Sequence, residues 1–232
     1  MVSVTSGVQV LDRAVEVLDT IARRGPCQLA ELVSETGLPR PPAHRIAVAL
    51  ERHGVLARDG AGRFVLGARA ATWGAAAAQG LATIAQPVLA RLSEATGESA
   101  QLYLREGSHR VCVAAYERPS GLRDTVPVGA VLPLDRGSGA KVLAAWAQDG
   151  SSLGIDDREL RAVRRRGWAE SAGEREAGVA SVSAPVWGHG DAIVAAISVS
   201  GPIDRMGQHP GRRLAPAVVN AAATLSRAVT TR

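Results

Sequence analysis

The chain has 232 residues, of which 46% are hydrophobic and 21% are charged, the ordinary balance of a globular protein. These values exclude collagen-like, disulfide-scaffold and wholly disordered chains, and the length predicts a small domain plus a medium one. The formal net charge of +5, carried by 26 arginines and Lys141 against 22 acidic residues, permits a polyanionic partner without requiring one. No stretch approaches the roughly 18 uncharged apolar residues of a membrane span, so we expect no membrane contact.

The start of the sequence shows no export signal, because neither a basic segment nor a long apolar core follows Met1. Cys27 and Cys112 are far apart in the sequence. Without an export signal we expect both thiols to be reduced and buried. The sequence therefore predicts a cytoplasmic protein.

Positive charge is concentrated in one window of the N-terminal third. Residues 40–69 carry six arginines and two acidic residues, whereas residues 1–39 carry three arginines and five acidic residues. Such a window is by itself typical of a solvated surface. Whether this basic window serves to bind a partner depends on the helices and strands that carry it.

Apolar residues at spacings of three and four predict helices over residues 8–24, 28–36 and 41–53. In the first helix they form the stripe Leu11, Ala14, Val15, Leu18, Ile21 and Ala22. Gly37, in the turn before the third helix, is suited to a positive φ. Residues 55–66 then predict strand, turn and strand. Three helices followed by a hairpin is the order of a winged helix-turn-helix domain, whose third helix reads DNA.

The third helix is expected to bury one face and to present its other, basic face to DNA. That face and the hairpin carry the candidate DNA contacts Arg40, His44, Arg45, Arg52, Arg58 and Arg63. Arginine can bond guanine twice in the major groove, and arginines of the wing can contact phosphate. The alternative is a small helical domain whose arginines are merely solvated. The joint match of order, turn, charge and hairpin favours DNA binding.

The rest of the chain predicts a linker and a second domain. Residues 68–80, rich in alanine, predict a linker helix whose Trp73 is expected either in the core or at a dimer contact. A helix over 81–95 follows. Residues rich in Val, Leu, Tyr and Ile predict strands at 99–105, 110–116, 123–128, 179–187 and 192–199. Helices at 137–147, 156–166 and 216–229 are interspersed with them, so we expect helices around one sheet.

Catalytic and metal-binding motifs are absent from the sequence. Residues 137–142 superficially resemble a phosphate loop, but there is no glycine before Lys141 and no hydroxyl residue after it. We instead expect a helix N-terminus whose free N–H groups face a small anion. His109 and Cys112 lie on opposite faces of a predicted strand, so neither a metal site nor a cofactor is expected.

A resemblance to IclR-type bacterial transcription regulators covers nearly the whole chain. Their DNA-binding domain resembles the stretch LAELVSETGLPRPPAHRIAVALERHGVLARDGAGRFVLG, and their effector domain resembles TGES, GLRDTVPVGAVLPLDRGSGAKVLAAW and AAISVSGP. The resemblance implies an α/β (α+β) chain with a winged helix-turn-helix domain (1–67), a linker helix (68–80) and a GAF-like effector-binding domain (81–232). It looks closest to the NdgR or LtbR type, which regulates leucine biosynthesis and amino-acid metabolism in actinobacteria.

The chain departs from the family at the start of the third helix. Pro41 and Pro42 stand there in place of the usual Ser-Thr pair. Pro42, which stays among the candidate DNA contacts, offers neither a hydroxyl nor an N–H group. Recognition is therefore expected to depend more on Arg40, His44 and Arg45.

The resemblance also implies an effector pocket, whose residues can be carried over position by position. Its residues here would be Leu122, Asp124, Leu132, Ser138, Gly139, Ser171, Val179, Ser181, Ser198 and Ser200. Ser198 and Ser200 lie two apart on a strand and share a face, where buried hydroxyls need partners: a bound carboxylate, or backbone and water. Ser171 and Ser181 replace an acid and a thiol of keto-acid-binding relatives. Asp124 brings a carboxylate, so an α-amino acid is the first guess for the effector.

These observations predict a ligand-responsive transcription regulator and not an enzyme. It would bind a palindromic double-stranded operator as a homodimer or a dimer of dimers. Its effector would be a small carboxylate or an amino acid, with leucine or a keto or malate precursor as the first candidates. Two alternatives are a GAF-type enzyme, for which the domain offers only Cys112 as a nucleophilic thiol, and a ligand-independent DNA-binding protein.

Overall fold

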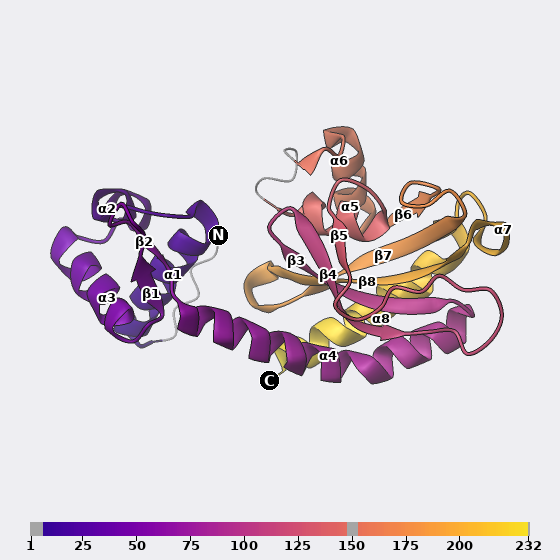
Figure 1. The fold of residues 1–232 in the computed structure, drawn as a ribbon, viewed down its shortest axis with the longest axis horizontal. Coiled ribbons are helices and arrows are strands. Elements are labelled where there is room, and N and C mark those ends of the chain that lie inside the picture. The colour runs from indigo at the N-terminus through magenta and orange to yellow at the C-terminus, as the bar shows by residue number, and fades with distance from the viewer. Residues whose placement is uncertain (1–6, 148–152, 232) are drawn as a thin grey trace. The chain divides into compact units, whose positions relative to one another are not determined.

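The computed structural model describes residues 7–147 and 153–231. Two predictions extend beyond these ranges: the absence of an export signal concerns the first six residues, and the predicted effector domain ends at Arg232. The chain forms two compact units, residues 1–77 and 78–232 (Figure 1). The boundary falls within α4 (Ala68–Thr96), a single helix that replaces the two predicted at 68–80 and 81–95. Among the described residues, no helix has both the length and the apolar character to cross a membrane.

The N-terminal unit follows the predicted order of elements. It contains α1 (Gln9–Arg24), α2 (Leu29–Thr36), α3 (Arg40–Arg52) and a hairpin of β1 (Leu56–Arg58) and β2 (Phe64–Leu66). A capping box starts α2, where the Glu31 carboxylate accepts the N–H of Gln28 at 2.8 Å. Gly37 ends that helix with a φ of +65°, which confirms the expected left-handed turn between α2 and α3.

The core of the N-terminal unit gathers around Phe64, the one phenylalanine of the chain, which is 1% exposed. Val17 and Ile21 of α1 belong to this core. The predicted apolar stripe of α1 is wrong in part, because Leu11 and Val15 are exposed. The helix packs through a face centred on the completely buried Val17, and the other two side chains lie on a different side of it.

The C-terminal unit is built on a six-stranded antiparallel sheet in the order β5-β4-β3-β8-β7-β6. Its strands are β3 (Ser99–Glu106), β4 (His109–Tyr116), β5 (Val131–Pro133), β6 (Ala169–Ala172), β7 (Val179–Trp187) and β8 (Ile193–Pro202). The strand predicted at 123–128 is wrong. β5 takes the free edge of β4 instead, and Pro127 has no N–H for a ladder. The two short edge strands, β5 and β6, were missed.

Helices cover both faces of this sheet (Figure 1). The second half of α4 and α8 (Gly211–Thr230) pack on one face, around a core that includes Leu89, Leu102 and Leu225. On the other face, α5 (Ser138–Ala145) and α6 (Asp157–Arg166) enclose a second core around Leu134 and Leu160. The short α7 (Ile203–Met206) and a 3-10 turn, η2 (His189–Asp191), lie in the connections. This architecture is the α+β class expected.

Candidate functional site

The first candidate site is the exposed face of α3. It carries four exposed basic or histidine side chains, Arg40, His44, Arg45 and Arg52, whereas Ala43 and Ala47 are completely buried. Pro41 and Pro42 occupy the first turn, where a missing N–H breaks no helical hydrogen bond, and Pro42 is half-buried. The three arginines have no hydrogen-bond or ion-pair partner within the described part of the chain. The face therefore presents positive charge that no acid neutralises.

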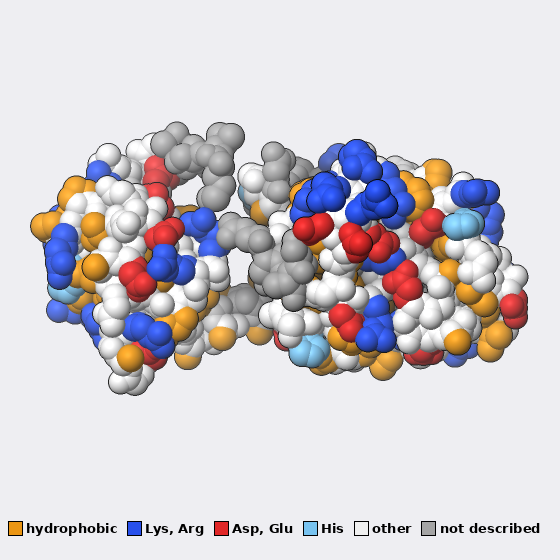
Figure 2. All heavy atoms as spheres, turned by 90° about the horizontal axis from the view of Figure 1, so that it is seen from above, with side chains coloured by type: hydrophobic (Ala, Val, Ile, Leu, Met, Phe, Trp, Pro, Cys, Tyr) orange, Lys and Arg blue, Asp and Glu red, His pale blue; other side chains and the backbone are white. Residues whose placement is uncertain are grey.

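The arginines of the hairpin are arranged differently. Arg58 donates from Nε to the Glu51 carboxylate at 3.0 Å, and its guanidinium lies 4.1 Å from the centroid of the Phe64 ring. Arg63 pairs with Asp59 at 2.7 Å, and its backbone N–H also donates to that carboxylate, which holds the pKa of Asp59 below its ordinary value. Each arginine of the wing thus has an acidic partner. Figure 2 shows acidic and basic side chains intermixed over the visible face of the N-terminal unit.

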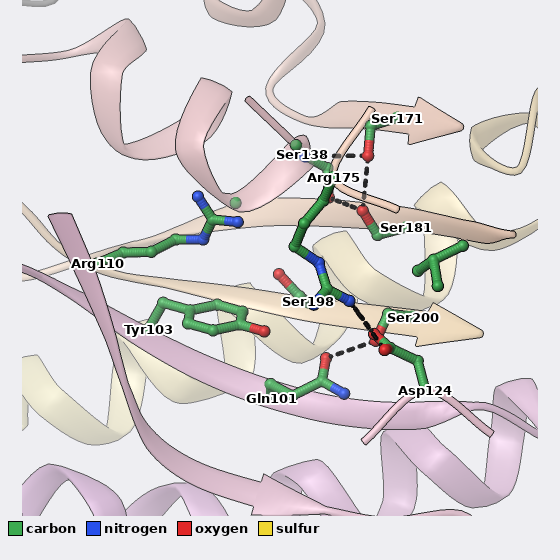
Figure 3. A pocket seen from close by; sticks show the side chains of 13 residues that line it. Gln101, Tyr103, Arg110, Asp124, Ser138, Ser171, Arg175, Ser181, Ser198 and Ser200 are labelled. Atoms are coloured by element: carbon green, nitrogen blue, oxygen red, sulfur yellow. Dashed lines mark hydrogen bonds and ion pairs between the residues drawn. The ribbon is translucent and has the colours of Figure 1, made fainter. Parts of the chain in front are cut away.

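The second candidate site is a pocket of the C-terminal unit, between the sheet and the start of α5 (Figure 3). Its lining includes eight of the residues carried over from the family: Asp124, Ser138, Gly139, Ser171, Val179, Ser181, Ser198 and Ser200. Leu122 and Leu132, which the resemblance also placed in the pocket, do not line it. Leu122 is 73% exposed on an irregular segment, and Leu132 lies on the edge strand β5. Five further residues that no sequence pattern indicated also line the pocket: Gln101, Tyr103, Arg110, Gly137 and Arg175.

Cross-strand pairing brings the serines of the pocket together. In the sheet, Ser181 pairs with Ser171 on one side and with Ser200 on the other, and Ser183 pairs with Ser198. Since alternate residues of a strand share a face, these side chains stand in rows on one face of the sheet. One continuous hydrogen-bonded chain joins five hydroxyls, those of Ser171, Ser181, Ser138, Ser183 and Ser198.

Ser198 and Ser200 are 2% and 4% exposed and share a face, as their spacing predicts. Their hydroxyls have protein partners, however. Ser198 bonds to Ser183, and Ser200 donates to the side-chain oxygen of Gln101 at 3.1 Å. Neither a ligand nor backbone nor water is needed to satisfy them. The buried serines alone therefore do not require an effector.

Three charged side chains line the pocket, and two of them pair with each other. Asp124 is 8% exposed and accepts from Nη2 of Arg175 through both carboxylate oxygens, at 2.8 and 2.7 Å. Burial lowers the pKa of Arg175, but the attraction of Asp124 outweighs it and the pKa is raised. Asp124 therefore already has a cationic partner, which weakens the interpretation that it receives the ammonium group of an amino acid.

Arg110 is the third charged side chain, and it is 4% exposed. Its Nη1 donates to the backbone oxygens of Pro133 and Arg136, whereas Nε has no partner and is buried. The guanidinium carbon lies 5.5 Å from the centroid of the Tyr103 ring. Burial lowers the pKa of Arg110, and Arg175 acts in the same direction. Figure 3 shows these two guanidinium groups entering the pocket from different sides.

The start of α5 adds backbone donors to the pocket. The N–H groups of Gly137 and Ser138 are bonded to side chains. Lys141 donates the first helical hydrogen bond, to the oxygen of Gly137 at 3.1 Å, so the N–H groups of Gly139 and Ala140 have no acceptor within the helix. Unsatisfied N–H groups at a helix N-terminus are suited to bind an anion.

The pocket is almost closed. Its volume is about 20 Å³, which is room for about one water molecule. An acid of several carbon atoms therefore fits only if part of the lining moves. Asp124, Gly137 and Arg175 lie on irregular segments that belong to neither a helix nor a strand, and these segments are the parts of the lining best able to move.

Neither cysteine has the environment of a reactive thiol. Cys27 and Cys112 are both completely buried and unpaired, as expected. Burial raises the pKa of Cys27, and it raises the pKa of Cys112 to about 11. Both thiols therefore stay protonated at neutral pH. Over the described ranges, no group of three or more His, Cys, Asp or Glu side chains could hold a metal ion.

Two family models match the chain. Residues 10–60 match the IclR helix-turn-helix domain, and residues 74–153 and 157–227 match the C-terminal domain of the bacterial transcriptional regulator IclR. The HTH-type transcriptional regulator BhcR of Paracoccus denitrificans is 29% identical, over 96% of this chain and 88% of its own length. The transcriptional repressor IclR of Escherichia coli is 27% identical, over 87% of this chain and 83% of its own.

Solved structures agree with these matches. A transcriptional regulator of the IclR family from Rhodococcus sp. has a TM-score of 0.61 at 25% identity, with 100% of this chain and 97% of that chain covered. The IclR of Thermotoga maritima has the same fold, with a TM-score of 0.60 at 23% identity, covering 95% and 98%. The matched proteins are transcriptional regulators and not enzymes. This chain therefore belongs to the IclR family of DNA-binding bacterial transcriptional regulators.

Proposed function

We propose that α3 and the wing contact operator DNA, and that the pocket of the C-terminal unit binds a small carboxylate or amino-acid effector that changes operator affinity. The proposed DNA contacts are Arg40, Pro42, His44, Arg45, Arg52, Arg58 and Arg63. The observation that carries this proposal is the set of exposed arginines on α3, which have no acidic partner in the described ranges. A helix with free guanidinium groups is suited to bases and phosphates of the major groove.

Substitution of Arg45 tests the placement of α3. Arg45→Ala is expected to cost about 1–3 kcal/mol of operator binding and to relax specificity at one base pair. The measurement is a titration at fixed salt, with an operator found by genome-wide mapping of bound DNA. Arg161→Ala, an exposed arginine of α6, is the matched control for the loss of one charge. Unchanged affinity in Arg45→Ala would show that α3 does not lie in the groove.

We propose that the operator is bound by a homodimer or a dimer of dimers, because one recognition helix reads only a short half-site. Trp73 of α4 is 55% exposed, so the core of the chain does not cover it, and residues 70–80 carry no charge. This helix therefore offers an apolar surface to a second copy. Light scattering at micromolar concentration should show a dimer or tetramer. A monomer that still binds operator with nanomolar affinity contradicts this.

We propose that operator binding responds to an effector bound in the pocket. A variant that loses this response should still bind the operator. Ser198→Ala with Ser200→Ala is expected to abolish the response, since both side chains line the pocket and belong to the C-terminal unit. Thermal shift with leucine and its keto and malate precursors tests the effector, because a specific ligand raises the melting temperature. An unaltered response in the double variant would remove these serines from the site. Absence of any ligand would favour a ligand-independent regulator.

Control of leucine biosynthesis or related amino-acid metabolism is the proposed biological role, and the resemblance to the NdgR or LtbR type supports it. Repression is the proposed direction of control. One relative is named as the acetate operon repressor of Salmonella typhimurium, at 27% identity over 94% of this chain. A transcript comparison between the wild-type strain and a deletion strain tests both points: leucine genes should rise in the deletion strain.

A further inference from the structure

Within the part of the chain that the structure describes, Arg110 is the charged side chain of the pocket that has no acidic partner. We infer that Arg110 selects ligands by charge, so that the pocket takes a small monocarboxylate without an ammonium group and discriminates against the matching amide and amino acid. This inference rests on the proposed effector pocket and names the residue that decides the charge of its ligand. No motif drew attention to this residue in the sequence.

The position of the guanidinium is the first observation. Arg110 reaches from β4 to the start of α5, where Nη1 is occupied by two backbone oxygens. Nη2 lies 3.3 Å from the place that a Cβ of Gly137 would take, and Nε lies 3.6 Å from that of Gly139. Both residues are glycines, so no side chain separates the guanidinium from the helix start. The unpartnered Nε is thus next to the free N–H groups of α5.

The electrostatics of this position are unfavourable without an anion. The N-terminus of a helix carries a partial positive charge, so a cation is disfavoured there. Arg175 brings a second guanidinium to the same pocket. A buried donor without a partner also costs free energy. One carboxylate between Arg110 and the N–H groups of Gly139 and Ala140 would relieve all three effects, because it supplies a negative charge and several acceptors.

The carboxylates of the neighbourhood are bonded to other cations. The ion pairs are Asp124 with Arg175, Glu159 and Glu174 with Lys141, and Asp135 with Arg136. Asp135 attracts Arg110 only at a distance, and no hydrogen bond joins Arg110 to any of these side chains. The partner for Arg110 must therefore come from outside the described chain.

The same pairing disfavours an ammonium group. An α-amino acid needs an acceptor for its ammonium as well as a donor for its carboxylate. Asp124 is the one carboxylate that lines the pocket, and Arg175 holds both of its oxygens. An ammonium group in the pocket would therefore face two guanidinium groups. A keto or hydroxy acid avoids this repulsion and keeps the carboxylate for Arg110.

Ligands matched in shape but different in charge test the inference on the full chain. Two series serve: pyruvate, pyruvamide and alanine, and 4-methyl-2-oxopentanoate, its amide and leucine. Calorimetry with the wild-type protein should show at least one acid bound, and bound at least about tenfold more tightly than its amide and its amino acid. Arg110→Met should weaken the binding of that acid by about 10- to 100-fold, the range for one hydrogen-bonded charge. The acid should then bind no more tightly than its amide.

Two further variants separate charge selection from structure. Arg110→Lys keeps the charge and should retain the preference for the acid at lower affinity, which gives a result even if Arg110→Met does not fold. Arg161→Met removes an exposed arginine of α6 that lies outside the pocket and should behave as wild type. The inference is wrong if no acid of either series binds, if the amide or amino acid binds as tightly, or if Arg110→Met keeps the preference.

An operator titration with and without the bound acid distinguishes this inference from the proposed function. If the acid binds with the expected charge preference but leaves operator affinity unchanged, the effector response fails and the role of Arg110 stands. If leucine changes the operator affinity and the acids do not, the effector response stands and the role of Arg110 is refuted.

Discussion

On α3 of the N-terminal unit, Arg40, Arg45 and Arg52 are exposed and have no acidic partner among the described residues, whereas in the C-terminal unit Arg175 and Arg205 are held by buried carboxylates. Water stabilises an exposed guanidinium, so a row of them can exist before DNA arrives. A buried charge loses that hydration and needs a partner within the protein or from a ligand. The placement of cations thus separates a surface for a polyanion from a pocket for one small anion.

The two units also differ in how their cores are built. The N-terminal core is small and centred on Phe64, whereas the C-terminal sheet has a separate core on each face. A small core has little stability to lose, because domains are stable by only about 5–15 kcal/mol. The units should therefore respond differently to a single core substitution.

Phe64→Ala is expected to have the largest effect of the substitutions considered. Loss of a buried phenylalanine costs about 3–5 kcal/mol, a large share of the stability of so small a unit. Operator binding should be lost, while the tryptophan fluorescence of the C-terminal unit, which contains Trp146, Trp168 and Trp187, stays native. Urea unfolding followed by fluorescence checks this. A matching loss of the fluorescence transition would mean that the two units do not unfold independently.

Arg205→Ala should destabilise the C-terminal unit by about 3 kcal/mol. Both carboxylate oxygens of Glu98 accept from Arg205 at 2.6 Å, and Glu98 is 1% exposed. Removal of the arginine leaves a buried carboxylate without a partner, which costs about 3–5 kcal/mol, and the partial exposure of Arg205 favours the lower end. Arg212→Ala, an exposed neighbour, is the control for urea unfolding. Equal stability of the two variants would contradict the comparison of buried and exposed charges.

The N-terminal unit could be predicted well from sequence because its signals are local. Apolar spacing and Gly37 placed the helices and their turn within a few residues. The sheet edges could not be predicted in this way. β5 and β6 are three and four residues long, too short to show a strand pattern of their own, and they form only by pairing with the free edges of β4 and β7. Residues 123–128 have the composition of a strand but no edge to join.

For the pocket, the resemblance and strand periodicity identified the serines and Asp124 but neither of the two arginines. Ser183 could have been found, because it lies two residues from Ser181 on the same strand and so shares its face. Arg110 and Arg175 could not be found in this way, since an arginine near the end of a strand or in a loop normally predicts a solvated side chain. The pair of Arg175 with Asp124 joins residues 51 apart, and only the folded chain brings them together.

Each unit contains one buried thiol. Alkaline pH should measurably lower the stability that the thiol of Cys112 gives to the C-terminal unit. The pKa of Cys112 is raised to about 11 from an ordinary value near 9. The folded state thus favours the protonated thiol. The contribution of this thiol to the free energy of unfolding is therefore fully present below pH 9, and it falls by about 2 kcal/mol as the pH rises to about 11. The difference in unfolding free energy between wild type and Cys112→Ala should shrink by that amount. A pH-independent difference would contradict the raised pKa.

The smallest expected effect concerns the wing, where Arg63 is paired and the arginines of α3 are not. Asp59→Asn should strengthen DNA binding by less than about 1 kcal/mol, because it frees the guanidinium of Arg63 for a phosphate. Asparagine keeps the oxygen that accepts the N–H groups of Ala61 and Arg63, so the turn is preserved. Each added phosphate contact steepens the salt dependence of log K by about 0.9, equally on operator and random DNA. Addition of Arg63→Ala should remove this gain and, because Arg63 is itself a proposed DNA contact, give a slope no steeper than that of the wild type. A slope unchanged in Asp59→Asn would mean that Arg63 does not reach phosphate, and that α3 carries the DNA contacts without the wing.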